Sequence, residues 1–256
     1  MTERDERVPL RGSAVTLEDY APGGTLRVAI NHGNVILAGR DSAGAPKGIS
    51  VDLAYALAQE LGSVPKFVEF DRALDVSSRA EADVWDLCFL AVDPDRAQVI
   101  GFSQPYVRIE GNYLVAERTG AIVPEDVVEQ GLKIGVVEGS AYALHLSRAR
   151  GAEGLVNFPS LAAAKAALAE GAVDGLAGIR QAMEAVAAMI PGTHVVGMPF
   201  MEIRQAMGVP ATRIRAHTHL SEFLARRARD GTVARILEAH GVDRACAVMP
   251  DDQGIG

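Results

Sequence analysis

The sequence has little that would build a disulfide framework, an aromatic binding platform or a membrane span. Only two of its 256 residues are cysteine, Cys88 and Cys246, so we predict neither a disulfide framework nor a thiolate metal site. Aromatic residues make up 5% of the chain, which is thin for stacking bases or sugars. No apolar run is long enough to cross a membrane. The net charge of -8, without a basic stripe, argues against a nucleic-acid partner.

Sequence motifs for metals and phosphates are also missing. His217 and His219 lie two residues apart, and no histidine pair has the i, i+4 spacing of a helical metal site. No glycine-rich phosphate loop follows a strand, and no G-x-S-x-G nucleophile turn occurs. We therefore expect neither a metal nor a cofactor.

The apolar content that is present suits a globular α/β protein. Hydrophobic residues make up 48% and charged residues 23% of the chain, enough for one large or two modest cores. Alternation and helical spacing predict repeated strand–helix–strand units, which imply parallel sheets covered by helices. The predicted strands span residues 25–30, 66–70, 86–90, 132–137, 155–158, 174–177 and 195–197. The predicted helices span residues 50–61, part of 72–82, a segment opened by Gly139 and Ser140, 161–170, 181–189, 220–229 and 233–239.

One segment combines a buried strand with a cation at the start of a helix. After the strand at 86–90, Asp93 is predicted as the N-cap, Pro94 as the first helical residue and Arg96 in the first turn. A cation there opposes the helix dipole, so helix stability does not explain it. A guanidinium at this turn could bind a carboxylate through two parallel hydrogen bonds. The alternative is a surface arginine paired with Asp93 or Asp95.

Five motifs in order resemble the amino-acid type of bacterial extracellular solute-binding proteins, family 3, from Gly24 to about Val242. They are residues 24–30 (GTLRVAI), 48–54 (GISVDLA), 93–97 with 102–106 (DPDRA and FSQPY), 134–140 (IGVVEGS) and 230–237 (DGTVARIL). Each motif alone is weak, but five in the right order are specific for the fold. They are much less specific for the ligand.

The resemblance implies a two-lobed type II periplasmic-binding-protein fold, each lobe a sheet flanked by helices. The expected parts are an N-terminal extension (1–23), a first lobe (24–115 plus 203–245), an inserted second lobe (118–200) and a tail (246–256). Crossings near Val115–Ala116 and near Met201–Glu202 would form a double hinge. The ligand would lie between the lobes, which would close around it.

The resemblance also implies ligand contacts. Arg96 matches the arginine that holds the ligand carboxylate in this family. Ser140 and Ala141 match the helix start in the second lobe that offers a hydroxyl and backbone N–H groups to the same carboxylate. Simple N-capping by Ser140 is the alternative, and both roles are compatible.

The departures from the family pattern concern the ligand's ammonium group. Amino-acid binders carry an aspartate after a strand of the second lobe, where this chain has Ile179 followed by Arg180. An ammonium facing Ile179 would be desolvated without a partner, which puts an ordinary α-amino acid in doubt. Asp93 could supply the negative charge, or could only cap the helix. Arg180 could hold a second acidic group, as in a dicarboxylate or keto acid, or could be solvated.

The first loop departs as well, because His32 and Asn34 stand where the family has an aromatic cover. Both could hydrogen-bond a polar ligand, and His32 could move a proton, although a loop histidine is often only solvated. Glu110, on the approach to the hinge, could contact the ligand or brace the hinge.

Two classes of function follow. The first is a solute-binding protein for a small carboxylate-bearing organic molecule, in uptake or sensing, with an ABC permease as partner if the protein is exported. The second is a lyase or dehydratase on the same fold, with His32, Asp93 or Glu110 as acid. The charged N-terminus shows no signal-peptide pattern, so either a leader is missing or this member stays in the cytoplasm. A ligand-free module is a third possibility.

Overall fold

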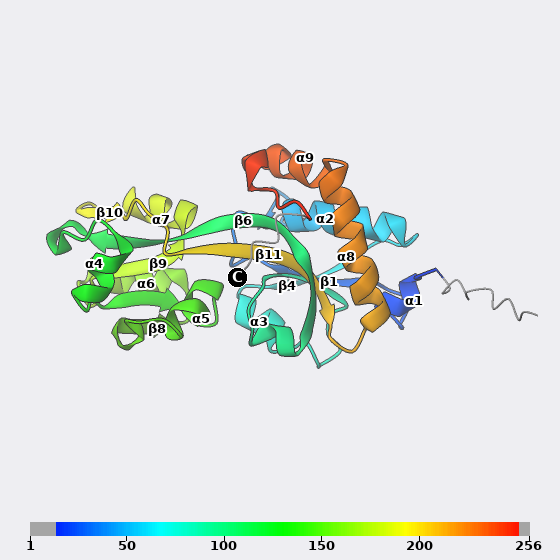
Figure 1. Ribbon diagram of the computed structural model, residues 1–256, viewed down its shortest axis with the longest axis horizontal. Helices are drawn as coiled ribbons and strands as arrows, with labels where there is room; N and C mark the ends of the chain where they lie inside the picture. Colours follow the sequence, from blue (N-terminus) through cyan, green and yellow to red (C-terminus); the bar gives the residue numbers. More distant parts are fainter. Residues whose placement is uncertain (1–13, 251–256) are drawn as a thin grey trace, which may run out of the picture.

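The computed structural model describes residues 14–250 and shows two α/β lobes joined by two long strands (Figure 1). The two strands are β6 (Ile100–Ala116) and β11 (Met201–Pro210), which pair antiparallel. One nine-stranded sheet runs through both lobes in the order β4-β1-β5-β11-β6-β9-β7-β8, with β10 paired to β6. The predicted two-lobed α/β architecture is therefore confirmed. The charged residues at the start of the N-terminal extension and the end of the tail lie outside the described residues.

The first lobe is built on parallel strands flanked by helices of both chain ends. β1 pairs in parallel with β4 and β5, and β5 is buried along its whole length because both faces are covered. The elements of this lobe are α1 (Leu17–Tyr20), β1 (Arg27–Asn31), β2 (Gly39–Arg40), β3 (Pro46–Lys47), α2 (Ile49–Glu60), β4 (Lys66–Phe70), α3 (Ala73–Ser77), β5 (Leu87–Ala91), η1 (Arg96–Gln98), α8 (Ile214–Arg229), α9 (Thr232–Ala239) and η4 (Arg244–Cys246).

The second lobe repeats the parallel arrangement on the other side of β6. β7 pairs in parallel with β8 and with β9, while β9 and β10 pair antiparallel with β6. Its elements are η2 (Glu117–Thr119), α4 (Pro124–Glu129), β7 (Ile134–Val137), α5 (Ala141–Ser147), η3 (Ala152–Gly154), β8 (Leu155–Phe158), α6 (Leu161–Ala169), β9 (Gly175–Ile179), α7 (Arg180–Ala187) and β10 (Thr193–Val195). The sheet is mixed rather than purely parallel, because β6 and β11 run against their neighbours.

The change from one lobe to the other occurs at Gly111. This residue is paired both with Met201 of β11 and with Ile179 of β9. A Cβ atom at position 111 would lie 2.8 Å from the Met201 Cγ and 3.2 Å from the Phe200 ring, so a glycine allows these side chains to approach the strand closely. The strand therefore changes its partner four residues before the expected crossing at Val115–Ala116. The division of the chain into two moving lobes stays a prediction.

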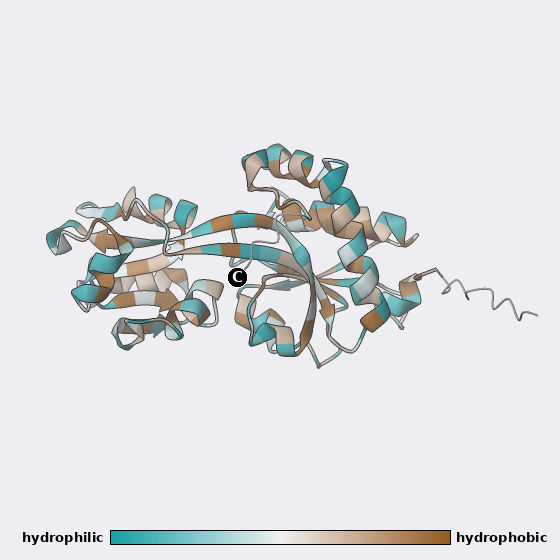
Figure 2. Ribbon diagram, viewed as in Figure 1, coloured by the Kyte–Doolittle hydropathy of each residue, from teal (hydrophilic) through white to brown (hydrophobic). Residues whose placement is uncertain are grey.

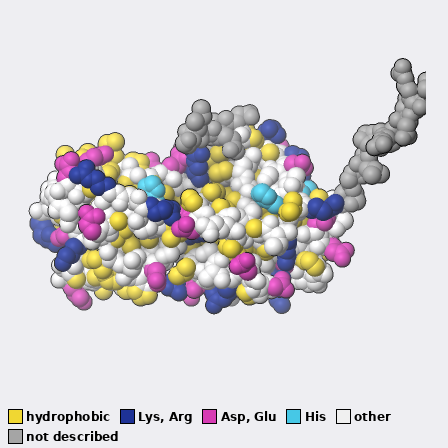
Figure 3. Space-filling view, turned by 60° about the horizontal axis from the view of Figure 1, so that its bottom comes forward, with side chains coloured by type: hydrophobic (Ala, Val, Ile, Leu, Met, Phe, Trp, Pro, Cys, Tyr) yellow, Lys and Arg dark blue, Asp and Glu magenta, His cyan; other side chains and the backbone are white. Residues whose placement is uncertain are grey.

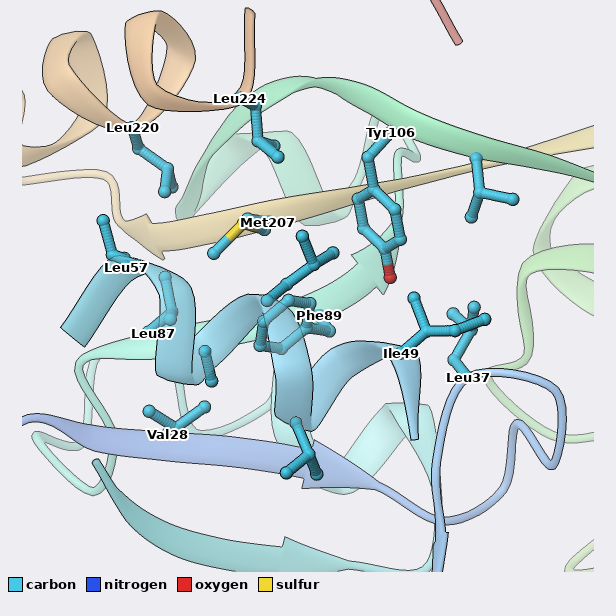
Figure 4. Packing of buried hydrophobic residues seen from close by; sticks show 14 of the residues in the cluster. Val28, Leu37, Ile49, Leu57, Leu87, Phe89, Tyr106, Met207, Leu220 and Leu224 are labelled. Atoms are coloured by element: carbon cyan, nitrogen blue, oxygen red, sulfur yellow. The ribbon is translucent and has the colours of Figure 1, made fainter. Parts of the chain in front are cut away.

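Apolar clusters stabilise both lobes, and the largest, centred in the first lobe, also includes Ile179 of β9. In this cluster, residues from α2, β5, β11 and α8 pack together, among them Leu57, Phe89, Met207 and Leu220 (Figure 4). The second lobe has two smaller clusters, on either side of its part of the sheet. Figure 2 shows hydrophobic residues along the strands and on the helix faces that pack against them, with hydrophilic residues outside. Burial of each leucine contributes about 2 kcal/mol.

The helices α5 and α6 begin where the sequence predicted, each after a serine whose side chain caps it. The bounds of α2, α7 and α9 lie within two residues of the predicted ones, whereas α8 begins at Ile214, six residues before the predicted Leu220. The Oγ atoms of Ser140 and Ser160 accept hydrogen bonds from the amides three residues on, at 3.2 Å each. Ser50 lies inside α2, which Gly48 precedes at a φ of 123°. After Asp93 the chain forms only the short 3-10 helix η1, so the helix predicted to begin at Pro94 is wrong.

Candidate ligand-binding cleft

A cavity of about 730 Å³ lies between the two lobes. The first lobe lines it with the loop after β1, the start of α3, the end of β5, η1 and part of β11. The second lobe contributes the ends of β7 and β9 and the first turns of α5, α6 and α7. The carboxyl ends of parallel strands from both lobes therefore meet at one place, where open α/β sheets bind small molecules. The volume lies in the range of about 300–1,000 Å³ that small-molecule sites occupy.

Arg96 is the buried cation of this cavity. Its side chain is only 4% exposed, and it donates to the carbonyl oxygens of Ala91 at 3.0 Å and Gly139 at 2.8 Å. Its Nε–H is buried and has no hydrogen-bond partner among the described residues. Arg96 also forms no ion pair with any of them. Burial lowers the pKa of Arg96. A guanidinium in this state has hydrogen-bonding capacity and positive charge left for an anion.

The contact of Arg96 with Gly139 joins the two lobes. Gly139 belongs to the turn between β7 and α5 in the second lobe, and its φ is 67°. A Cβ atom at this position would lie 2.6 Å from the Cβ of Leu74 in α3 of the first lobe. The turn therefore needs a glycine both for its left-handed backbone and for its close approach to the other lobe.

The other two residues expected at this turn also line the cavity. The Ser140 hydroxyl caps α5, as the simpler of the two hypotheses predicted, and Ala141 lies in its first turn. The neighbouring Tyr142 lines the cavity too. Burial raises the pKa of its hydroxyl, and a hydrogen bond with Ser140 opposes that rise.

His32 and Asn34 line the cavity from the loop after β1, each already hydrogen-bonded. The His32 Nε2 atom lies 2.8 Å from the Glu69 Oε2, and Glu69 also pairs with Arg40. The Asn34 Oδ1 accepts from the Ile36 amide at 3.3 Å. Both residues line the cavity, and their contact with a ligand stays a prediction.

Asp93 lies next to the cavity but pairs with another residue. It is 4% exposed, its Oδ1 accepts from the Asp95 amide at 3.0 Å, and its Oδ2 lies 2.5 Å from the Arg148 Nη2. Arg148 also pairs with Asp95 at 2.9 Å. Arg148 lies at the end of α5, so these bonds bridge the lobes. Asp93 is absent from the cavity lining.

Arg180 and Glu110 bind each other outside the cavity lining. The Arg180 Nε donates to the Glu110 carboxylate, and its Nη2 donates to the Gly197 carbonyl at 2.7 Å. These bonds tie α7 to β6 and to the segment before β11. Of the roles weighed for Glu110, bracing the region where the strands cross fits this pairing best.

Three charged residues of the lining were missed by the sequence reasoning. Asp71, Arg72 and Asp75 lie at the start of α3, and Arg72 binds Asp75 through Nε–Oδ2 at 3.0 Å and Nη2–Oδ1 at 2.9 Å. The i, i+3 spacing of Arg72 and Asp75 on a predicted helix was the signal available. Arg72 lies 3.7 Å from Glu138 of the second lobe, a further contact across the cleft.

Within residues 14–250 no group of three or more histidine, cysteine or acidic side chains could hold a metal ion. Cys88 is fully buried, as predicted for a core residue. Acidic and basic side chains are interspersed on the face shown in Figure 3, so that neither sign dominates that face.

Solved structures with this fold include binding proteins and a sensor. A mutant of ArgBP from T. maritima is 19% identical, with a TM-score of 0.73 over 88% of this chain and 98% of that one. A histidine kinase sensor domain with similarity to periplasmic binding proteins is 19% identical, with a TM-score of 0.74 and the same coverage, 88% and 98%. The L-cysteine solute receptor of Neisseria gonorrhoeae is 19% identical, with a TM-score of 0.73 over 88% and 93%. These likenesses define a type II periplasmic-binding-protein fold.

The sequence itself identifies the family. The profile of the bacterial extracellular solute-binding proteins, family 3, matches residues 26–242. The chain belongs to this family. No curated protein matches the sequence significantly. Among the helices of residues 14–250, none has the length and apolarity needed to cross a bilayer.

Proposed function

We propose that the protein binds a small organic molecule through its carboxylate, in the cavity between the lobes, with Arg96 as the anchor. The observation that supports this most is the state of Arg96: buried, cationic, and hydrogen-bonded only to neutral carbonyls in the described part of the chain. Keeping such a charge out of water is costly unless an anion balances it. A carboxylate matches the planar guanidinium through parallel hydrogen bonds.

Both lobes contribute residues to the cavity lining, and this supports closure of the lobes around the ligand. A ligand bound to Arg96 in the first lobe and to the turn at Ser140–Ala141 in the second would hold the lobes together. Closure of this kind serves uptake, through an ABC permease, or sensing, and both uses remain part of the proposal. The neighbours named for arginine and L-cysteine binding, and the sensor domain, fit both uses.

The test is binding of small acids to the purified protein, measured by thermal shift and calorimetry. A ligand at a hundred times its Kd stabilises the native state by about 2.7 kcal/mol. Arg96→Gln should abolish this shift. Arg229→Gln is the matched control, because Arg229 is an exposed arginine at the end of α8, far from the lining. If Arg96→Gln binds every acid as tightly as the unaltered protein, the proposed anchor is wrong.

The lyase alternative stays a prediction with weaker support. Of its three candidate acids, only His32 lines the cavity, and it is bonded to Glu69. Asp93 and Glu110 are each paired with an arginine. Incubating the protein with any acid that binds, and looking for a new product by mass spectrometry, distinguishes turnover from binding.

A further inference from the structure

We infer that the ligand is an organic acid without an α-ammonium group and with an apolar body, such as a 2-oxo or 2-hydroxy acid. This inference rests on the proposed function, since it assumes that Arg96 holds a carboxylate. The observations that support the inference are the charges and the apolar surface of the same cavity.

An ammonium group needs an available carboxylate, and the described lining has two candidates, Asp71 and Asp75. Asp75 is fully engaged. Both of its oxygens accept from Arg72, at 2.9 and 3.0 Å, and Arg79 lies 3.9 Å from Oδ1. A carboxylate held bidentately by one arginine has its charge balanced before any ligand arrives.

Asp71 is exposed to solvent, in the loop that leads into α3. An ion pair at an exposed position contributes little, because water and salt screen it. In the described lining Arg96 forms no ion pair, although the charge of Asp93 acts on it, and no buried carboxylate is free to face a ligand cation. This arrangement favours a ligand whose net charge is negative over a zwitterion.

The side of the cavity formed by β9 and α7 is apolar. Ile179, at the end of β9, is 9% exposed, and Ala182 and Met183 follow it in α7. Leu90 and Ile203 extend this surface on β5 and β11. An ammonium against these side chains would lose its hydration without gaining a partner, whereas an alkyl or aromatic group would gain by burial.

Gln205 is the neutral polar group of the lining that has both a donor and an acceptor left for the atom next to the carboxylate. Gln205 of β11 is 5% exposed and lines the cavity, and the described residues offer its side-chain amide no hydrogen bond. An amide both donates and accepts, so it suits a 2-oxo or a 2-hydroxy group equally. The Asn31 and Asn34 carbonyls already accept from the Gly33 and Ile36 amides.

The test compares matched pairs that differ only at the α-position. Leucine is titrated against 4-methyl-2-oxopentanoate, and phenylalanine against phenylpyruvate and phenyllactate, by calorimetry on the full chain. We expect the oxo or hydroxy acid to bind at least about tenfold more tightly, which corresponds to about 1.4 kcal/mol. If an amino acid binds as tightly as its partner or more so, this inference is overturned while the carboxylate anchor stands. If none of these acids binds, this inference fails, and the thermal-shift test against small acids decides separately whether the carboxylate anchor stands.

A variant gives a second, independent comparison. Ile179→Asp should raise the affinity for the amino acid and lower the affinity for the oxo acid. Ile179→Asn introduces a side chain of the same shape as aspartate without its charge, so it should not raise the affinity for the amino acid. Circular dichroism and a thermal melt show whether each variant folds. A folded Ile179→Asp with the same preference as the unaltered protein would contradict the position assigned to the α-carbon. The titrations of the unaltered protein decide the question if neither variant folds.

Discussion

The guanidinium of Arg148 and the carboxylate of Asp93 form an ion pair across the cleft, 55 residues apart in sequence, at 2.5 Å. Arg148 is half-exposed while Asp93 is buried, so the pair forms where the edges of the two lobes meet. A buried carboxylate that loses its arginine is left with a large desolvation cost. In a two-lobed protein that cost can be relieved by opening the cleft, which lets water reach Asp93, rather than by unfolding.

The first prediction follows from this pair. Arg148→Ala should raise the radius of gyration of the ligand-free protein and weaken ligand binding by about 1–2 kcal/mol, with little change in the Tm. Small-angle X-ray scattering and calorimetry measure the two effects. Arg150→Ala is the control, because Arg150 is exposed and makes no ion pair with the described residues. A variant as compact as the unaltered protein, with the same affinity, would contradict a role for Arg148 in closure.

The second prediction concerns the close approach at Gly139. Gly139→Ala places a methyl group 2.6 Å from the Cβ of Leu74 and should weaken ligand binding, because it forces the two lobes apart at this contact. Gly131→Ala is a matched control: its φ of 63° is similar, and no atom lies within 4 Å of the added Cβ. Both variants lose about 1–2 kcal/mol of stability to backbone strain. Equal affinities in the two variants would show that the contact with Leu74 is unimportant for binding.

The third prediction is that removal of Arg72 frees the carboxylate of Asp75 to face the ligand. Arg72→Gln removes both hydrogen bonds to Asp75, so the balance between amino acids and oxo acids should move toward amino acids. Loss of Arg72 also removes the cause that holds the pKa of Asp75 below its usual value. Arg79→Gln, which leaves the bidentate pair in place, should have no such effect. Competition calorimetry with a matched acid pair measures the change, and an unchanged ratio would argue against Asp75 facing the ligand.

The fourth prediction is a pH dependence in the second lobe. The pKa of Asp174 is lowered, first by the hydrogen bond from the Lys133 amide at 3.0 Å and then by Arg118 at 2.9 Å. Because the native pKa lies below the unfolded value of 3.8, this stabilisation is fully present above pH 3.8. It is lost as the pH falls through the native pKa.

Asp174→Asn should therefore lower the free energy of unfolding by about 1–2 kcal/mol at pH 7, with a difference that shrinks below pH 3.8. Urea unfolding at a series of pH values measures it. Glu170→Gln is the control, because Glu170 is an exposed carboxylate at the end of α6. If the difference in the free energy of unfolding between the variant and the unaltered protein does not change with pH, the charge of Asp174 does not contribute to stability.

Local patterns predicted much of the fold. The strands at 66–70 and 155–158, the cap at Ser140 and the helix start at Leu161 depend on nearest neighbours in sequence, and the structure has them where the pattern predicted. The helix predicted over 50–61 begins at Ile49, after Gly48, where a Cβ atom would lie 2.6 Å from the Leu37 carbonyl oxygen. That contact joins two segments that sequence spacing alone does not relate.

The long strands were harder to predict, because β6 serves two lobes. It contains Pro105 and Gly111, and its pairing with β11 shifts register twice, so it lacks the simple alternation of a strand with one buried face. Five of the predicted site residues line the cavity: Arg96, Ser140, Ala141, His32 and Asn34. Asp93, Arg180 and Glu110 do not, because each is held in an ion pair between the lobes that no local pattern encodes.

The shared sheet has a mechanical consequence. Because hydrogen bonds run without a break from β4 to β8, the lobes are not separate bodies on a flexible tether. If the lobes open and close as proposed, β6 and β11 have to change their twist, and Gly111 is where the pairing of β6 passes from one lobe to the other. Part of the ligand's binding free energy would then be spent on twisting these two strands.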